Sequence, residues 1–130
     1  MDTTPTNSIT AVVHRGAQFL DIAVPDWFAP NCATPIDVQS LDLGRFSHCI
    51  LGQLCTADLV RSMDKYGAWC RAIQRRFHQT ADLSPGSFQR WTQDHGFYPI
   101  RYMETPVWKT IAKSAWIAEI THRRKQAAQA

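Results

Sequence analysis

Prolines divide this chain into segments and mark where its helices begin and end. Three of them fall in "PDWFAPNCATP", which predicts a loop over residues 25–35. Farther along, Pro85 follows Ser84 and Pro106 follows Thr105, and a hydroxyl-bearing cap before a proline is typical of a helix start. The prolines therefore predict helices with defined ends, joined by irregular segments.

Apolar residues at three- and four-residue spacing support this interpretation, because that spacing places them on one face of a helix. Together with the capping signals it predicts five helices, over residues 10–23, 46–54, 58–79, 85–95 and 106–125. The predicted inner face of the last helix consists of Val107, Ile111, Ala115 and Ala118, with Trp116 beside it. We therefore expect a mainly α, compact single-domain fold of about five helices.

The length of the chain sets its domain organisation. With 130 residues it fits one domain and can bury roughly two thirds of its unfolded surface, so it needs neither a disulfide nor a metal ion to fold. We expect a disordered N-terminal tail over residues 1–8, a globular domain over residues 9–126 and a frayed C-terminus over residues 127–130. A minor two-stranded β element, formed by residues 36–43 and 98–103, is left open as an addition to the helices.

The sequence lacks the features of a membrane or secreted protein. The N-terminus, "MDTTPTNS", has no basic region followed by an apolar run, and no apolar stretch is long enough to span a bilayer. We therefore expect a cytoplasmic protein without membrane contact. In that reducing compartment Cys32, Cys49, Cys55 and Cys70 are interpreted as free thiols first and as disulfides second.

The block "SHCILGQL" places His48 beside Cys49, with Cys55 six residues after the first thiol. Zinc ligands usually include a pair two to four residues apart, and six residues of helix turn the two thiols about 120° away from each other. A metal or redox site is therefore disfavoured, and we expect no cofactor. Cys49 is interpreted as a small buried hydrophobe. Gln53, if buried, needs hydrogen-bond partners, which a neighbouring loop would supply, so Cys49 and Gln53 are the candidates for a buried polar or thiol site.

No catalytic signature is found in the sequence: it has no nucleophile elbow, no phosphate loop and no dinucleotide fingerprint. The histidines are scattered, at His14, His48, His78, His95 and His122. His95 follows Asp94 at a predicted helix end, where a histidine is more often a capping group than a base. We therefore expect a protein that is not an enzyme.

Charge is unevenly distributed along the chain. Residues 1–60 carry two basic and six acidic side chains, a net charge of −4, whereas residues 61–130 carry twelve basic and five acidic ones, a net charge of +7. This asymmetry predicts a basic surface built from the second half. The candidate contacts to nucleic acid or to an acidic partner are Arg71, Arg75, Arg76, Lys109, Lys113, Arg123, Arg124 and Lys125.

Five tryptophans are a heavy aromatic load for a domain of this size. They supply either core or anchors for a partner protein. We expect Trp27 and Phe28 to fold the proline-rich loop onto the core. The candidate partner-contact aromatics are Trp27, Trp69, Trp91 and Trp108.

Several short motifs follow one another along the chain: "RGAQFLD", "VPDWF", "IDVQSLDL", "CILGQL", "HGF", and a tryptophan followed by arginine in the last helix. Over about half of the chain this order resembles a group of small uncharacterised proteins encoded by actinobacteria and their phages. Residues 57–90 depart from the pattern, and Asp26 stands where the group has glycine. The resemblance implies a phage or prophage setting and brings no activity.

These observations lead to two hypotheses of function. The leading one is a small cytoplasmic protein of phage or mobile-element type that binds another protein of host or phage and inhibits it. The alternative is a nucleic-acid-binding accessory or regulatory protein that uses the basic second half of the chain.

Overall fold

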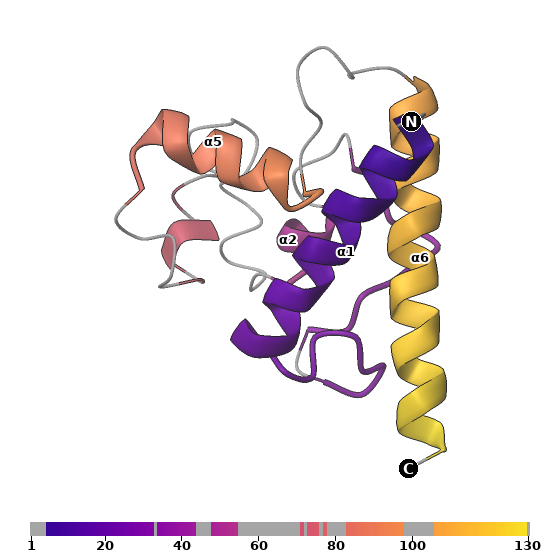
Figure 1. Cartoon of the computed structure of the whole chain (residues 1–130). Helices are drawn as coiled ribbons and strands as arrows, with labels where there is room; N and C mark the ends of the chain where they lie inside the picture. The colour runs from indigo at the N-terminus through magenta and orange to yellow at the C-terminus, as the bar shows by residue number, and fades with distance from the viewer. Residues whose placement is uncertain are drawn as a thin grey trace.

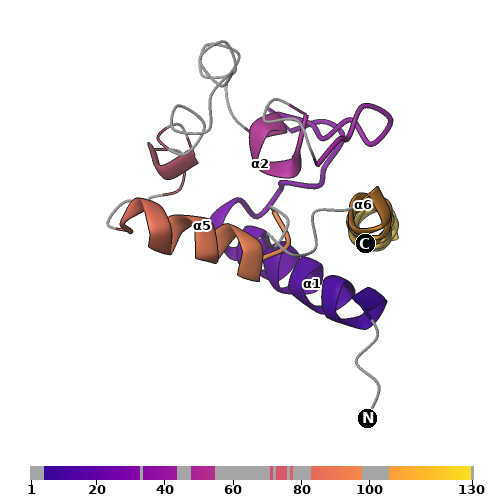
Figure 2. The same cartoon turned by 90° about the horizontal axis from the view of Figure 1, so that it is seen from above.

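Two long helices, α1 (Pro5–Ala23) and α6 (Pro106–Ala128), lie side by side, run in the same direction and are inclined to each other (Figures 1 and 2). The computed structural model of the protein describes residues 5–32, 34–43, 48–54, 71, 73–75, 77, 83–97 and 106–129. In these ranges the helices α1, α2 (Ile50–Gln53), α5 (Pro85–Asp94) and α6 hold most of the residues, and no strand occurs. The mainly α fold class is therefore confirmed.

Helix α1 turns an apolar stripe towards the interior. Ile9, Val13, Ala17 and Leu20 each expose 2% of their surface or less, and they recur at the spacing that predicted the helix. The helix ends at Ala23, as predicted, shortly before Pro25. It begins at Pro5, within the segment 1–8 that we expected to be a tail, and residues 1–4 lie outside the described ranges.

Helix α6 begins at Pro106, as predicted, and continues to Ala128, beyond the predicted end at residue 125. Its buried residues are Trp108, Ala112, Trp116 and Ile120, whereas Val107 is 64% exposed and Ala118 is exposed. The predicted inner face was therefore wrong by about one position. The reason is burial: turning the two tryptophans inward removes far more apolar surface from water than turning in a valine and alanines would.

Local signals predicted both ends of α5. The Ser84 side chain accepts a hydrogen bond from the backbone N–H of Ser87, and Pro85 occupies the first position of the helix. His95 caps the C-terminal end, and Gly96 follows with φ +70°, a left-handed conformation that favours glycine.

The turn after α5 lies against α1, and α6 closes over it. A Cβ at residue 16 would collide with the carbonyl oxygen of His95, so Gly16 is what allows this close approach. A Cβ on Gly96 would likewise lie 2.7 Å from the Cα of Val13. Nε1 of Trp116 donates to the carbonyl oxygen of Gly96 at 2.9 Å. We call Gly16, His95, Gly96 and Trp116 the three-helix junction, because α1, α5 and α6 meet there.

Helix α2 and the loop that follows α1 lie on one side of α1, between α5 and α6, as Figure 2 shows from above. Trp27 has no exposed surface, so the prediction that it folds this loop onto the core is confirmed. The loop continues through Ile36 and Leu41, which expose 3% and 1% of their surface. Residues 36–43 form bends, a turn and irregular chain and not the strand left open by the sequence, and residues 98–103 lie outside the described ranges.

Two predicted helices are described only in part. Helix α2 begins at Ile50, later than the predicted start at residue 46, and residues 44–47 and 55–70 lie outside the described ranges. Of the predicted helix 58–79, Ile73 and Phe77 are described as buried, as its apolar stripe predicts. No helix in the described ranges combines the length and the apolar character needed to cross a membrane.

Candidate functional site

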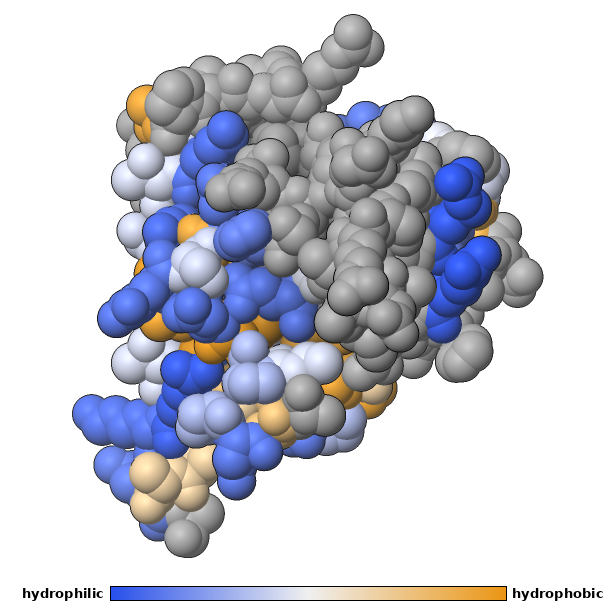
Figure 3. Space-filling view, turned by 180° about the vertical axis from the view of Figure 1, so that it is seen from behind, coloured by the Kyte–Doolittle hydropathy of each residue, from blue (hydrophilic) through white to orange (hydrophobic). Residues whose placement is uncertain are grey.

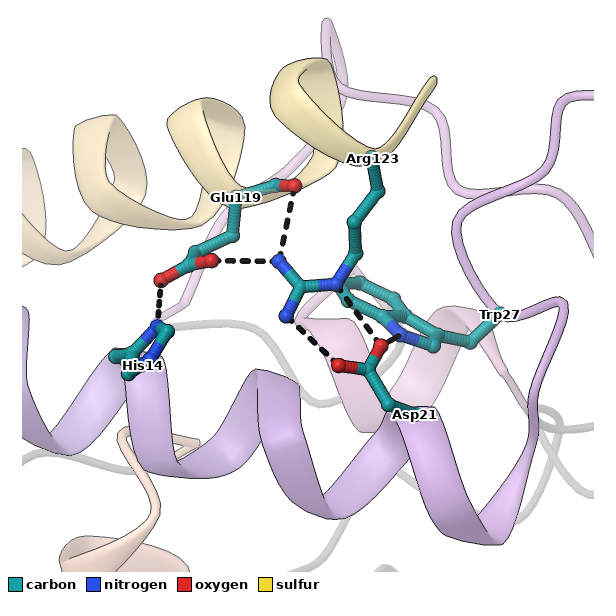
Figure 4. Close-up of polar contacts among 5 residues, drawn as sticks. All are labelled: His14, Asp21, Trp27, Glu119 and Arg123. Carbon is teal, nitrogen blue, oxygen red and sulfur yellow. Dashed lines mark hydrogen bonds and ion pairs between the residues drawn. The ribbon is translucent and has the colours of Figure 1, made fainter. Parts of the chain in front are cut away.

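Arg123 lies at the centre of a polar network that joins α6 to α1 (Figure 4). Its Nε donates to Oδ1 of Asp21 at 2.9 Å and its Nη2 donates to Oδ2 at 2.8 Å, a fork that matches the planar guanidinium to the carboxylate. Its Nη1 donates to Oε2 of Glu119 at 2.5 Å and to the backbone oxygen of the same residue at 3.2 Å. The guanidinium is therefore held by carboxylates from two helices.

His14 and Trp27 extend this network at its two ends. Nδ1 of His14 lies 2.7 Å from Oε1 of Glu119, and Nε1 of Trp27 donates to Oδ1 of Asp21 at 2.9 Å. The Arg123 guanidinium carbon lies 5.6 Å from the centre of the Trp27 ring, within the range of a cation–π contact. We call these five residues the interhelical network, because their contacts fasten α1, α6 and the loop after α1 to one another.

The interhelical network keeps its three charges ionised. A hydrogen bond from Arg123 holds the pKa of Asp21 below its usual range. Burial alone would raise the pKa of Glu119, but hydrogen bonds from Arg123 and His14 outweigh that effect and lower it. The hydrogen bond to Asp21 raises the pKa of Arg123 in turn. Groups held in their charged forms in this way are poor proton donors or acceptors at neutral pH.

A hollow of about 510 Å³ opens beside the interhelical network, between the C-terminal ends of α1 and α6. This C-terminal hollow is lined by His14, Asp21, Pro25, Phe28, Glu119, His122, Arg123, Gln126 and Ala127. Its carboxylates and its guanidinium are paired with one another. Outside those pairs, Pro25, Phe28 and Ala127 give the C-terminal hollow apolar lining surface, and His122 and Gln126 add polar groups.

A second hollow, of about 430 Å³, lies between the first turns of α6 and the loop before α2. This N-terminal hollow is lined by Gln39, Ser40, Leu41, Asp42, Leu43, His48, Lys109, Thr110 and Lys113. Lys109 and Lys113 are one helical turn apart, and neither takes part in an ion pair with a described carboxylate. Among the described residues, the two lysines of the N-terminal hollow are therefore not ion-paired, whereas the charged groups of the C-terminal hollow are.

The structure separates the eight basic side chains that the sequence grouped together. Arg123 is committed to the interhelical network. Arg124 donates from Nε to the backbone oxygen of Phe28 at 2.7 Å and from Nη2 to that of Ile36 at 3.0 Å. Both side chains are half-buried and hold parts of the fold together, so less of each is available for the predicted contact with nucleic acid or an acidic partner.

The other basic candidates whose side chains are described lie on two separate parts of the molecule. Lys109 and Lys125 are exposed and Lys113 is half-buried, all on α6, whereas Arg71 and Arg75 are exposed on a segment across the molecule from α6 (Figures 1 and 2). Arg76 lies outside the residues whose side chains are described. Seen from behind in Figure 3, the side where α6 lies is largely hydrophilic, with a narrow hydrophobic band beside it.

The tryptophan predictions also need correction. Trp27 and Trp108 expose 0% and 2% of their surface, so both are core and offer no area to a partner. Trp91 is partly buried and stacks on His95 with ring centres 4.6 Å apart and on Phe97 at 5.5 Å. Trp69 lies outside the described ranges. Large aromatic rings went inside because they remove the most apolar surface from water.

Cys49 and Gln53 fasten the loop before α2. Cys49 is not in a disulfide and is 2% exposed, and its Sγ caps α2 by accepting from the backbone N–H of Gly52 at 3.3 Å. The Gln53 side chain accepts from the N–H of Asp37 at 2.7 Å and donates to the backbone oxygen of His48 at 2.9 Å. The hydrogen-bond partners that Gln53 was expected to need are therefore present, although the side chain is only half-buried.

The prediction that His95 is a capping group is confirmed. Its Nδ1 lies 2.7 Å from the carbonyl oxygen of Trp91, and because a carbonyl can only accept, Nδ1 carries the proton. Burial lowers the pKa of His95, so the ring is neutral at pH 7. Among the described residues no group of three or more potential ligands is placed to hold a metal ion.

Sequence reasoning did not find the interhelical network. The spacing of Glu119 and Arg123 is a signal for a pair on one helix, since residues four apart face each other. Asp21 and Arg123, however, are 102 residues apart. No rule of local spacing connects two such positions, so the network becomes visible only when the fold brings α1 and α6 together.

Comparisons with protein-family models, with curated proteins and with solved structures found no match for this chain.

Proposed function

We propose that this chain is a small binding protein of phage or mobile-element type that attaches to another protein in the cytoplasm and inhibits it, without being an enzyme. The observation that carries the proposal is the C-terminal hollow. Its charged groups are satisfied by one another, and its remaining lining includes Pro25, Phe28 and Ala127. The partner is expected to place an apolar side chain in it.

The pairing of the charges decides what kind of group fits the C-terminal hollow. Asp21, Glu119 and Arg123 already have short hydrogen bonds, so a charged ligand would have to break them to form its own. An apolar side chain breaks nothing and gains about 1.5–3 kcal/mol from full burial. Because the walls are held in place before binding, little conformational entropy is lost when the partner arrives.

The position of the C-terminal hollow suits contact with a large partner. The last turns of α6 extend past the rest of the described chain at the lower end of Figure 1. His122 and Ala127 are exposed there, and a partner can reach them without displacing another element. The two imidazole rings, of His14 and His122, can hydrogen-bond to the partner's backbone at the rim.

The resemblance to proteins of actinobacteria and their phages supports the proposed setting. Asp21, Trp27 and Arg123 belong to the motifs on which the resemblance rests, and the same three residues build or support one wall of the C-terminal hollow. A wall of this kind is therefore the feature we expect such proteins to share.

The test is a capture experiment with two matched variants on the same helix. Ala127→Glu puts a charge and extra bulk into the C-terminal hollow, while Ala128→Glu adds the same group one position away, outside the lining. Both alanines are exposed, so neither change should unfold the protein. The tagged chain and both variants are applied to actinobacterial lysate, and captured proteins are identified by mass spectrometry.

A partner captured by the wild type and by Ala128→Glu, but at least about tenfold less by Ala127→Glu, supports the proposal. Titration of that purified partner should show a negative heat-capacity change, as burial of apolar surface requires. Equal capture by both variants, or no specific partner at all, contradicts it.

Nucleic-acid binding, the alternative function, has weaker support, because Arg123 and Arg124 are engaged inside the fold and Arg71 and Arg75 lie across from α6. A salt titration tests it. Phosphate contacts predict an affinity that falls steeply as salt rises, whereas no binding to duplex or single strand at low salt rules it out.

A further inference from the structure

The N-terminal hollow differs in chemistry from the C-terminal one and has no part in the proposed function. Two ammonium groups, Lys109 and Lys113, border it from successive turns of α6. Lys113 is half-buried, so its stem is partly fixed by the surrounding chain. Neither lysine is ion-paired to a described carboxylate. Positive charge held at a concave surface attracts an anion.

Asp42 limits which anions fit the N-terminal hollow. Its carboxylate is the one acidic group among the described lining residues, and it repels a second anion placed beside it. A ligand must therefore set its negative charge near the lysines and turn hydrogen-bond donors, such as hydroxyls, towards Asp42.

The size of the N-terminal hollow also suits a small anionic ligand. Its volume, about 430 Å³, lies within the range of small-molecule sites. Leu41 and Leu43, whose exposed fractions are only 1% and 4%, give it an apolar base. Two lysines suit the doubly charged end of a phosphate monoester, which carries about −1.5 to −2 charges at neutral pH.

From this arrangement we infer that the N-terminal hollow binds the phosphate ester of a sugar, with Lys109 and Lys113 on the phosphate and Asp42 on a sugar hydroxyl. Free nucleotides and sugar phosphates carry this chemistry, and so does a nucleic-acid strand. The proposal commits to the free small molecule, because two neighbouring lysines suit a doubly charged monoester, whereas the internal phosphates of a strand are diesters that carry one charge each.

The experiment is isothermal titration calorimetry on the full chain at low salt with adenosine monophosphate, glucose 6-phosphate, inorganic phosphate, adenosine and a short single-stranded DNA. The two phosphate esters should bind with Kd at or below about 1 mM, and adenosine, which lacks phosphate, should not bind. Lys109→Gln and Lys113→Gln should each weaken the esters at least about tenfold. Lys125→Gln, a lysine on the same helix that does not line the hollow, should change nothing.

Asp42→Asn separates a shaped site from general attraction to positive charge. The variant should bind inorganic phosphate more tightly, because a repelling charge is removed. Its affinity for glucose 6-phosphate should fall relative to its affinity for inorganic phosphate, because the sugar hydroxyl loses its charged acceptor. Absence of saturable binding by either ester overturns the proposal, and so does an equal loss in the Lys113→Gln and Lys125→Gln variants. The proposal is also overturned if the wild type binds DNA more tightly than adenosine monophosphate and all three lysine variants lose DNA affinity to the same extent. That result would assign the positive charge to a nucleic-acid contact. Thermal unfolding of each variant verifies that the fold is retained.

Discussion

The two ends of α6 carry the same kind of charge and use it in opposite ways. Near the C-terminal end, Arg123 donates hydrogen bonds to Asp21 and Glu119. Arg124 donates to backbone oxygens, and both side chains are half-buried. Near the N-terminal end, Lys109 and Lys113 face a hollow and have no described ion-pair partner. A basic residue count therefore measures neither surface charge nor binding capacity.

The difference follows from side-chain chemistry as well as from position. A guanidinium presents several donors in a rigid plane and can satisfy two acceptors while it is partly buried. An ammonium is more strongly hydrated and sits more readily at a wet surface. Arginine at the end of α6 thus fastens the fold, and lysine at its start stays open to a ligand.

The largest effect is expected where α6 is held at its middle, between these two ends. Gly16→Ala places a Cβ against the backbone oxygen of His95, which cannot move without disturbing the three-helix junction, and should cost roughly 3 kcal/mol or more of unfolding free energy. The matched control is Gly86→Ala on α5, where the added Cβ meets nothing within 4 Å. Urea denaturation should find the control unchanged or slightly stabilised. Equal costs for the two variants would show that the junction does not hold the helix.

The second largest effect is expected at the C-terminal end of α6, where Arg123 is ion-paired. Arg123→Gln leaves Asp21 and Glu119 without their counter-ion and should destabilise the protein by about 2 kcal/mol, less than for a fully buried pair because Asp21 is partly exposed. Arg123→Lys keeps the charge and loses the fork, so it should recover only part of that loss. If Arg123→Gln unfolds at the same urea concentration as the wild type, the interhelical network has no role in stability.

The third effect is a change with pH in the stability difference between the wild type and Arg123→Gln. In the folded chain the pKa values of Asp21 and Glu119 are lowered, so the unfolded chain binds more protons in acid. The stability that these carboxylates contribute is complete above their unfolded pKa and is lost as pH falls from about 5 through the folded pKa values. The gap between wild type and Arg123→Gln should therefore narrow on acidification, as followed by thermal unfolding. A gap that stays constant from neutral pH into acid would contradict the assigned ion pairs.

What the sequence could predict depended on the range of the interaction concerned. The cap at Ser84, the stop at Gly96 and the start of α6 at Pro106 were read correctly because each signal lies within a few residues of its effect. The inner face of α6 was misplaced because two stripes, one position apart, both have helical spacing, and only the packing of Trp108 against the rest of the core selects between them.

The candidate sites were harder to predict for the same reason. Each hollow is formed by residues that are distant in sequence, such as Pro25 with Ala127 or Asp42 with Lys109. Lys109 and Lys113 were identified as basic contacts, but nothing local distinguished them from Arg123 and Arg124. That distinction rests on acceptors supplied by α1 and by the loop after it.

The smallest expected effect completes the comparison at the N-terminal end of α6. Lys109→Gln and Lys113→Gln remove charges that no described carboxylate compensates, so each should change the unfolding free energy by no more than about 0.5 kcal/mol. These are the same substitutions that should weaken binding of a phosphate ester, so one pair of variants separates stability from ligand binding. If urea denaturation shows a loss of unfolding free energy as large as that of Arg123→Gln, these lysines stabilise the fold as Arg123 does. The contrast between the two ends of α6 would then disappear.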